Sequence, residues 1–366
     1  MANGPLKRLE RAWKQAWMRA LAASLPVPPR GAAPEWGAGP RRVLYLRYDR
    51  IGDMILATGL IRAIAASHPR IELDVLASPA NASMLDGNPH VRTVRIFRRK
   101  ARGSWLPLFR ALRRARYDAV VDGMVLAPSL TTLLIMLATR ARYRIGVGAR
   151  SNDFIYTHPV APAGPTVHIA EQSGATAAPF GVDVANADWT PHLFLAPGER
   201  ARAEETWSGA GGARVVRLLV NISTAQPRHR WPDDRFISVL RALAEHTADL
   251  CIGVTGAPAD AASVRRVARE TGAVPLDVPL REALALVATA DVVFTPDTSI
   301  AHMAAAFAKP QVVMLRRRME IFAPYRGRGR HVYTEGASLA ELPPEPVLEA
   351  LKEVLCGVLS DTNRGA

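Results

Sequence analysis

Short apolar runs alternate with longer segments of helical periodicity along most of this chain. Between residues 42 and 146, runs typical of buried strands recur at 43–47, 72–76, 93–97, 119–121 and 143–146. Segments with helical spacing separate them at 54–67, 81–85, 106–116 and 129–139. Strands that alternate with helices in this way predict a parallel sheet with helices on both faces.

A second series of the same kind begins near residue 217. Its strands are expected at 217–221, 249–254, 274–277, 292–295 and 311–315, and its helices at 233–246, 259–271, 281–290, 300–307 and 346–359. The chain has 366 residues, a length that suits two domains. We therefore predict an α/β protein with two doubly wound domains, at 41–205 and 206–345, which face each other across a cleft. A helix and tail follow at 346–366.

The first 40 residues have a different pattern. In residues 1–24, apolar side chains that include Trp13 and Trp17 recur every three or four positions, with basic residues between them. This is what an interfacial membrane helix needs, and a helix docked on the protein's own surface or a frayed terminus are the alternatives. Residues 25–40 are rich in Pro, Gly and Ala and indicate a linker. Residues 1–24 lack a continuous apolar core, so we expect no cleavable signal peptide. The uncharged run 123–139 is short for a membrane span and is expected to form a buried helix, so we expect peripheral membrane contact at most.

Charge adds a second constraint. The net charge of +14 favours an anionic partner such as a phosphorylated substrate, phospholipid headgroups or nucleic acid, with a coding bias toward Arg as the alternative explanation. No recognition helix or basic sheet with interleaved aromatic residues supports nucleic acid, so we predict no nucleic-acid partner.

The two cysteines, Cys251 and Cys356, are too few for a disulfide framework or a zinc site and fit a reducing cytosol.

The most informative candidate site follows the first strand, at Gly52-Asp53. An apolar strand runs into a tight turn and then into a helix headed by these residues. This layout places a carboxylate and several backbone N–H groups at the carboxyl edge of a parallel sheet, where open α/β folds bind ligands. Asp53 is either a general base or a helix-terminal carboxylate favoured by the dipole, and Asp49 competes for the catalytic role.

Residues 221–232 follow the first strand of the second domain and lead into a helix. They offer two hydroxyls, two arginines and a histidine, at Ser223, Thr224, Arg228, His229 and Arg230. Hydroxyls, backbone N–H groups and guanidinium forks suit a diphosphate. The alternative is a solvated basic loop that Trp231 anchors.

Three further polar residues, Asp297, Thr298 and Ser299, end a strand and start a helix. They can bind phosphate oxygens, or they can form an ordinary N-cap. His302, one turn inside that helix, is a structural hydrogen bonder or a site residue. Asp260 follows the second strand of this domain and can accept hydrogen bonds from ribose hydroxyls.

Several motifs are absent. There is no P-loop, no dinucleotide-binding glycine fingerprint and no G-x-S-x-G elbow. No Asp-x-Asp pair is present to hold a divalent ion against a diphosphate. We therefore expect no metal and no cofactor. If the substrate is a nucleotide-sugar, the negative charge of the leaving group must be stabilised by arginines, hydroxyls and helix ends.

Six short motifs follow one another along residues 42–358. They are VLYLRYDRIGDM at 43–54, GNPH at 87–90, RIG at 144–146, HIAEQ at 168–172, RWPDDRF at 230–236 and DTSIAHMAAA at 297–306. In this order they resemble glycosyltransferase family 9, the ADP-heptose:lipopolysaccharide heptosyltransferases and their relatives. The resemblance implies a GT-B fold with two Rossmann-like domains and inverting, metal-independent transfer of a heptose-like sugar from a nucleotide-diphosphate donor.

The resemblance also implies roles for particular residues. Asp53 is the expected catalytic base, and Asp49, Arg50 and Gly52 beside it are expected to bind the acceptor. The donor, expected to be ADP-linked, lies on the second domain. The resemblance places its phosphates near Asp297, Thr298 and Ser299 and its ribose near Asp260. The other residues expected to bind the donor are Ser223, Thr224, Arg228, His229, Arg230 and His302.

Three departures from the family pattern accompany these matches. His229 stands where relatives usually have a phosphate-binding lysine, and Ser299 where they often have a glycine. The sequence RRRME at 316–320 replaces a small, Gly-rich loop.

We predict a glycosyltransferase that acts on a lipopolysaccharide or other lipid-linked glycan at the cytoplasmic face of the inner membrane. The alternative is a catalytically weak or inactive protein that binds nucleotide-sugars or glycolipids.

Overall fold

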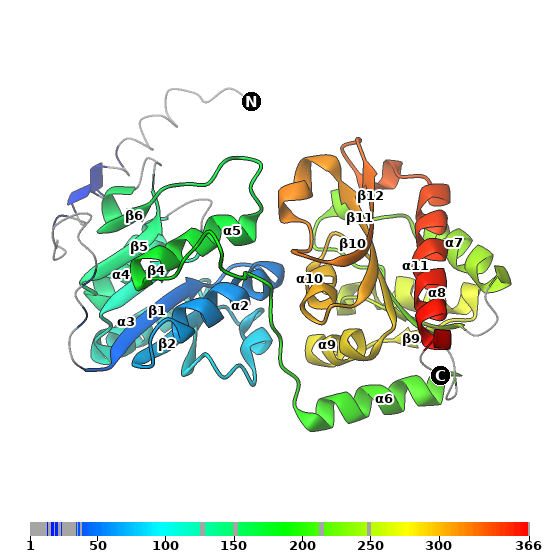
Figure 1. The fold of residues 1–366 in the computed structure, drawn as a ribbon, viewed down its shortest axis with the longest axis horizontal. Coiled ribbons are helices and arrows are strands. Elements are labelled where there is room, and N and C mark those ends of the chain that lie inside the picture. The colour runs from blue at the N-terminus through cyan, green and yellow to red at the C-terminus, as the bar shows by residue number, and fades with distance from the viewer. Residues whose placement is uncertain are drawn as a thin grey trace. The chain divides into compact units, whose positions relative to one another are not determined.

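The structure of this chain is a computed structural model. It describes residues 39–124, 129–148, 153–211, 216–246 and 250–364, with a few isolated positions between 13 and 36. The predicted basic helix at 1–24 and the linker at 25–40 lie largely outside the described residues. The chain divides into two compact units, Met1–Trp189 and Thr190–Ala366, which Figure 1 colours from blue to green and from green to red.

The first unit contains a six-stranded parallel sheet in the order β3-β2-β1-β4-β5-β6. Its strands are β1 (Arg41–Arg47), β2 (Ile71–Ala77), β3 (Thr93–Ile96), β4 (Ala119–Asp122), β5 (Tyr143–Val147) and β6 (His158–Val160). Its helices are α2 (Ile51–Ala66), α3 (Trp105–Ala115), α4 (Leu130–Thr139) and α5 (Ile169–Gly174), with short 3-10 turns η1 (Ala82–Leu85), η2 (Arg102–Ser104), η3 (Asp153–Ile155) and η4 (Ala175–Phe180).

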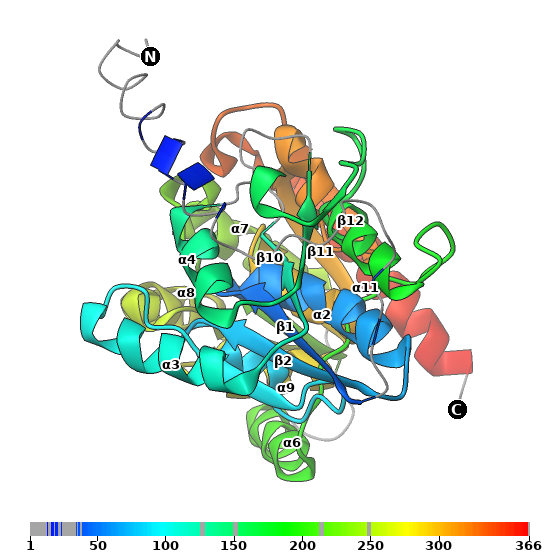
Figure 2. The ribbon, with the colours of Figure 1, turned by 90° about the vertical axis from the view of Figure 1, so that its left-hand side faces the viewer.

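Helices cover both faces of this sheet, because the chain moves outward from β1 to β3 and then crosses back to β4. α2 packs with α5 on one face, and α3 packs with α4 on the other (Figures 1 and 2). Leu44 and Leu46 of β1 join the apolar cluster under α3 and α4 that also contains Leu133. Since side chains alternate along a strand, Tyr45 and Arg47 point to the opposite face.

The second unit repeats this plan with the order β12-β11-β10-β7-β8-β9. Its strands are β7 (Val216–Asn221), β8 (Leu250–Thr255), β9 (Val274–Leu276), β10 (Val292–Pro296), β11 (Pro310–Arg316) and β12 (Arg328–Thr334). Its helices are α6 (Pro197–Gly211), α7 (Asp233–His246), α8 (Ala261–Thr271), α9 (Leu280–Thr289), α10 (Ser299–Ala306) and α11 (Pro344–Arg364), with 3-10 turns η5 (Pro227–His229), η6 (Pro258–Asp260), η7 (Arg317–Phe322) and η8 (Leu339–Glu341). α7 packs against α8 and α11, and α9 against α6 and α10 (Figure 1).

Each sheet has one point at which its strand order reverses. In the first unit this point lies between β1 and β4, and in the second between β7 and β10. In open α/β sheets, ligands bind in the crevice beyond the carboxyl ends of the strands at this point. The fold alone therefore marks one candidate ligand-binding edge in each unit.

The predicted α/β fold with two doubly wound domains is confirmed, and each strand expected from the apolar runs is present. The domain boundary differs: we predicted it between 205 and 206, and the structure places it between Trp189 and Thr190. The reason is α6, which packs on α9 and fixes the buried Trp207 through a 3.1 Å hydrogen bond from its Nε1 to Oγ1 of Thr289. The last helix, predicted as a separate segment at 346–366, contributes Val347 to the core of the second unit.

Among the strands and α-helices of the described residues, four were not predicted, namely β6, α5, α6 and β12. β12 has the sequence RGRHVYT, whose charged residues hide its strand character. Charged side chains are common on edge strands such as this one, because they discourage pairing with other chains.

Candidate functional site

The first candidate site lies at the carboxyl ends of β1 and β4. Asp53 is in the first turn of α2, and its side chain is 23% exposed. Asp49 precedes the helix in the turn after β1, with a side chain that is 30% exposed. Arg50 occupies the N-cap position without a side-chain cap and is exposed, and Gly52 is half-buried in the first turn. The structure thus brings together all four residues predicted for the first candidate site. We call this site the first half-site, and the donor-binding candidate site of the second unit the second half-site.

A buried arginine that the sequence analysis did not single out holds both carboxylates. Arg47 ends β1, and its side chain lies 3.1 Å from Oδ1 of Asp53 and 3.4 Å from Oδ1 of Asp49. It also donates hydrogen bonds to the carbonyl oxygens of Asp53, at 3.0 Å, and Gly123. Burial alone would lower the pKa of Arg47, but the nearby carboxylates and Tyr45 raise it above its ordinary value. Arg47 therefore stays charged and fixes the orientation of the Asp53 carboxylate.

Asp49 differs from Asp53 in its electrostatic setting. Burial raises the pKa of Asp49 and the charge of Asp53 raises it further, while Arg47 opposes both effects. Asp53 instead lies at the start of a 16-residue helix, whose dipole favours a negative charge. The two carboxylates therefore differ in setting, and Asp53 is the one that a helix terminus favours as an anion-binding or catalytic position.

The buried side chain of Asn81 shapes the turn that carries these residues. Its Nδ2 donates to the carbonyl oxygens of Arg47, at 3.0 Å, and Arg50, at 3.4 Å, and its Oδ1 accepts from the backbone N–H of Ser78 at 2.8 Å. The turn after β1 is thus tied to the end of β2. This explains how backbone groups with no ladder partner remain satisfied beside the site.

A third carboxylate, Asp122, ends β4 and is almost completely buried. Its Oδ2 accepts a 2.6 Å hydrogen bond from the hydroxyl of Tyr156, and its Oδ1 accepts one from the backbone N–H of Met124 at 3.0 Å. Burial raises the pKa of Asp122 from 3.8 to about 6, although both hydrogen bonds and Arg47 lower it. Arg47 therefore sits among three acidic side chains at one end of the sheet.

Replacement of Asp122 by Asn should remove a pH dependence of stability. The folded protein holds the Asp122 proton more tightly than the unfolded chain does, because its pKa rises from 3.8 to about 6 on folding. The resulting stabilisation is complete below pH 3.8 and is lost as the pH rises through about 6. It amounts to roughly 3 kcal/mol. Urea denaturation of wild type and D122N between about pH 4 and about pH 8 measures it. A difference in unfolding free energy that does not change with pH would contradict the prediction.

The second candidate site lies at the carboxyl ends of β7 and β10. Asn221, the last residue of β7, donates from Nδ2 to Oγ1 of Thr295, at 2.9 Å, and to Oγ1 of Thr298, at 3.1 Å. Thr298 caps α10 by accepting from the N–H of Ile300 at 3.3 Å. The hydroxyl of Ser223 accepts from the N–H of Ala257 at 2.7 Å. These bonds join the ends of three adjacent strands into one polar edge.

Beside this edge, His229 lies between an acid and a base. Its Nδ1 is 3.4 Å from Oδ2 of Asp297, and its Nε2 is 2.9 Å from a terminal nitrogen of Arg316. Asp297 and His229 were both predicted as donor-binding residues, whereas Arg316 was noted only as part of a replaced loop. The structure shows that this loop begins next to His229.

Arg230 and Asp260, both predicted to bind the donor, bind each other. A terminal nitrogen of Arg230 lies 2.6 Å from Oδ1 of Asp260, and another lies 3.1 Å from Oδ1 of Asp233. Arg228 is exposed and donates to the side chain of Gln226 at 2.9 Å. In this structure Arg230 is therefore neutralised by two carboxylates.

The remaining predicted residues lie around the same edge. Thr224 accepts a 3.3 Å hydrogen bond from the N–H of Gln226. Ser299 is the half-buried first residue of α10, and His302 is buried one turn later. Each predicted residue of the second half-site thus lies on the loops or helix starts that follow β7, β8 and β10.

Sequence reasoning missed a set of polar residues with a common position. They are Arg47, Asp122, Asn221 and Arg316, the last residues of β1, β4, β7 and β11. The sequence signal that could have revealed them is a polar residue at the last position of an apolar strand. Since parallel strands end at the same edge, such residues gather at the ligand-binding side of a sheet.

Comparison with known proteins identifies the family. The sequence model of glycosyltransferase family 9 (heptosyltransferase) matches residues 105–341, more than half of the chain. The chain belongs to glycosyltransferase family 9. The matched range covers the second half-site completely, whereas Asp53 and Arg47 lie before its first residue.

Relatives of this family 9 glycosyltransferase are similar along most of its length. The lipopolysaccharide core heptosyltransferase OpsX of Haemophilus influenzae is 18% identical over 291 residues, which cover 76% of this chain and 80% of OpsX. A family 9 glycosyltransferase of Veillonella parvula has a similar fold, with a TM-score of 0.76, 18% identity and coverage of 87% of this chain and 98% of its own. The E. coli heptosyltransferase WaaC, solved with ADP, gives a TM-score of 0.67, 19% identity and coverage of 85% and 97%.

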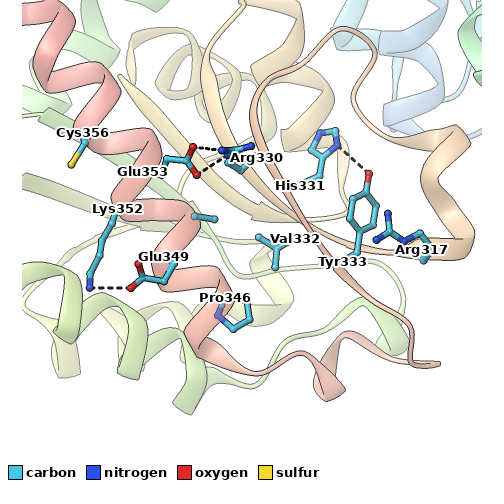
Figure 3. A pocket seen from close by; sticks show the side chains of 11 residues that line it. Arg317, Arg330, His331, Val332, Tyr333, Pro346, Glu349, Lys352, Glu353 and Cys356 are labelled. Atoms are coloured by element: carbon cyan, nitrogen blue, oxygen red, sulfur yellow. Dashed lines mark hydrogen bonds and ion pairs between the residues drawn. The ribbon is translucent and has the colours of Figure 1, made fainter.

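One groove of the family 9 glycosyltransferase belongs to the second unit, and none of the predicted site residues lines it. It has a volume of about 610 Å³ and is lined by side chains of β12, α11 and the start of η7 (Figure 3). Figure 3 shows Arg330 paired with Glu353 and Lys352 paired with Glu349, while Arg317 lies beside Tyr333. Because its charges are largely paired, we assign no ligand to this groove.

Neither a metal site nor a membrane span is present among the described residues. Among them, no group of three or more His, Cys, Asp or Glu side chains is arranged to hold a metal ion. In the same part of the chain, no helix is both long and apolar enough to cross a membrane. Cys251 and Cys356 are both free thiols.

Proposed function

We propose that this family 9 glycosyltransferase transfers a heptose-like sugar, with inversion and without a metal, from an ADP-linked donor to a lipopolysaccharide or other lipid-linked acceptor. The observation that carries the proposal is the Asp53 carboxylate, which is partly exposed at the strand reversal of the first unit and is held by the buried Arg47. The similarity to the heptosyltransferases OpsX and WaaC supports the class of reaction. The proposal requires the two half-sites to share a cleft, which stays a prediction.

The acceptor half of the reaction uses the first unit. Asp53 takes the proton of an acceptor hydroxyl as the oxygen attacks the anomeric carbon of the donor. The bond from that carbon to the diphosphate oxygen breaks on the opposite face, so the configuration inverts. Asp49, Arg50 and Gly52, in the turn and helix start beside Asp53, bind the acceptor.

The donor half uses the carboxyl edge of the second unit. When the sugar departs, negative charge builds on the diphosphate, and prearranged cations and N–H or O–H donors stabilise it. The residues that we propose for this task are Ser223, Thr224, Arg228, His229, Arg230, Asp297, Thr298, Ser299 and His302, with Asp260 near the ribose. The N-terminus of α10 adds a favourable dipole for a phosphate group.

We place the reaction at the cytoplasmic face of the inner membrane, with peripheral contact through residues 1–24. The net charge of +14 would attract the enzyme to an anionic membrane surface. Of the aromatic residues in this segment, Trp13 is 67% exposed and Trp17 is 54% exposed. Both are suited to the interface between water and lipid.

ADP should raise the thermal unfolding midpoint of the purified protein more than GDP, UDP or dTDP does. A ligand that binds only the folded state at about 100 times its Kd stabilises by about 2.7 kcal/mol. For a domain of this size, that corresponds to a rise of about 5–10 °C. Differential scanning fluorimetry with the four nucleotides, and with adenosine as the control, measures it. If none of the four raises the midpoint, the assignment of a nucleotide-sugar donor fails.

The alternative is a protein that binds nucleotide-sugars or glycolipids without turnover. The pairing of Arg230 with Asp233 and Asp260 favours it, since this arginine is already neutralised. Transfer of radiolabelled heptose from ADP-heptose to a lipopolysaccharide core acceptor by the purified protein would exclude this alternative.

A further inference from the structure

Arg316 brings a cation to the second half-site from β11, a strand that none of the predicted site residues follows. It ends β11, and a terminal nitrogen of its guanidinium donates to Nε2 of His229 at 2.9 Å. Its Nε is enclosed, and within the part of the chain that the structure describes it has no hydrogen-bond acceptor. An enclosed N–H of a charged group without an acceptor is costly, so the hydrogen bonding of Arg316 is incomplete within the described residues.

The contact with His229 fixes the state of the imidazole. Arginine has only donors, so Nε2 of His229 must accept and therefore carries no proton. His229 is neutral in this arrangement and carries its proton on Nδ1, which lies 3.4 Å from Oδ2 of Asp297. The imidazole thus keeps the guanidinium of Arg316 separate from the carboxylate of Asp297.

This arrangement distinguishes Arg316 from its neighbours. Arg230 is paired directly with Asp233 and Asp260, at 3.1 and 2.6 Å. In the described part of the chain, no carboxylate is paired with Arg316. Of these two arginines, Arg316 is therefore the one whose positive charge is available to an anionic ligand.

The next residue, Arg317, points elsewhere. Its guanidinium carbon lies 3.9 Å from the centre of the Tyr333 ring, and its Nε lies 3.2 Å from Oε1 of Glu335. Figure 3 shows Arg317 and Tyr333 together in the groove beside β12. Two consecutive arginines thus serve different surfaces, and Arg317 offers a matched control.

We propose that Arg316 binds a phosphate group of the nucleotide-sugar donor, and that His229 acts as a positioning residue that orients its guanidinium. This inference rests on the proposed function and adds one donor-binding residue to it. Its chemical basis is a guanidinium fork with N–H groups to spare, next to the polar edge formed by Asn221, Thr295 and Thr298. Arg316 thereby supplies the positive charge that the neutral His229 does not carry.

The test compares Arg316→Gln with Arg317→Gln by isothermal titration calorimetry. The probe is whichever of ADP, GDP, UDP and dTDP binds the wild type most tightly, with its nucleoside as the phosphate-free control. Arg316→Gln should weaken binding of the diphosphate by about 10- to 100-fold and leave nucleoside binding unchanged. Arg317→Gln should bind both as the wild type does. A second substitution, His229→Lys, in the Arg316→Gln variant returns one positive charge to the same place and should recover part of the lost affinity.

The outcomes separate three cases. Diphosphate affinity that stays at the wild-type value in Arg316→Gln would overturn the inference while leaving the proposed function intact. Equal losses for the diphosphate and the nucleoside would also overturn it, because they indicate a structural role. A wild-type protein that binds none of the four diphosphates would contradict the proposed function itself.

Discussion

Replacement of Asp53 by Asn should lower the rate of sugar transfer by about 10²- to 10⁴-fold and leave ADP affinity unchanged. Asn keeps the shape of the side chain and can still accept a hydrogen bond from Arg47, which lies 3.1 Å from Oδ1 of Asp53. It cannot take a proton from the acceptor hydroxyl. Initial rates with ADP-heptose and a lipopolysaccharide core acceptor measure the first effect, and calorimetric titration with ADP measures the second.

Asp49→Asn is the matched control for this experiment. Asp49 lies 3.4 Å from the same arginine, and its side chain is about as exposed as that of Asp53. If Asp53 is the base, Asp49→Asn should retain most of the activity, and any loss should appear mainly in KM for the acceptor. The reverse pattern, with an active Asp53→Asn and an inactive Asp49→Asn, would transfer the catalytic role to Asp49.

The fold could be predicted from the sequence because the central strands of each sheet are buried on both faces. Such strands appear as continuous apolar runs, and β1, β7 and β10 show this clearly. β12 was not predicted, because an edge strand needs only one apolar face and carries charged residues on the other. The domain boundary was not predicted correctly, because a crossover helix such as α6 belongs to the unit on which it packs. A local sequence pattern does not reveal which unit that is.

The candidate sites could be predicted only in part. Loops with hydroxyls and helix starts were visible, and they led to Asp53, Thr298 and His229. The contacts that give these residues their properties involve partners distant in sequence, such as Arg316, which lies 87 positions from His229. Only the order of the strands in the sheet brings these partners together.

The motifs that revealed the family contain structural residues as well as candidate site residues. Trp231 is completely buried, and its Nε1 donates to the carbonyl oxygen of Leu342 at 2.8 Å. His168 caps α5 through its Nδ1, which accepts from the N–H of Ala170 at 3.1 Å. A motif therefore identifies a family more reliably than it identifies the chemistry of each of its residues.

Replacement of Arg47 by Met should destabilise the protein by about 3–5 kcal/mol. Met fills a similar volume, but it leaves the carboxylates of Asp49, Asp53 and Asp122 next to one another without the cation that now lies among them. The carbonyl oxygen of Gly123 would also lose its donor. Chemical denaturation measures the change in the free energy of unfolding. Arg47→Lys should lower the free energy of unfolding by less than Arg47→Met does. Lysine keeps the positive charge, although it cannot reach every acceptor at once.

The cause of the Arg47→Met effect can be isolated by removing the carboxylates first. In an Asp49→Asn/Asp53→Asn background, the same substitution leaves fewer uncompensated charges, so its cost should fall to a fraction of that in the wild type. An undiminished cost would mean that Arg47 stabilises the protein through packing and its bond to Gly123, and not through the two carboxylates. In that case Arg47 would fix the backbone around Asp53 without setting the charge of the site, and Arg47→Lys would be as unstable as Arg47→Met.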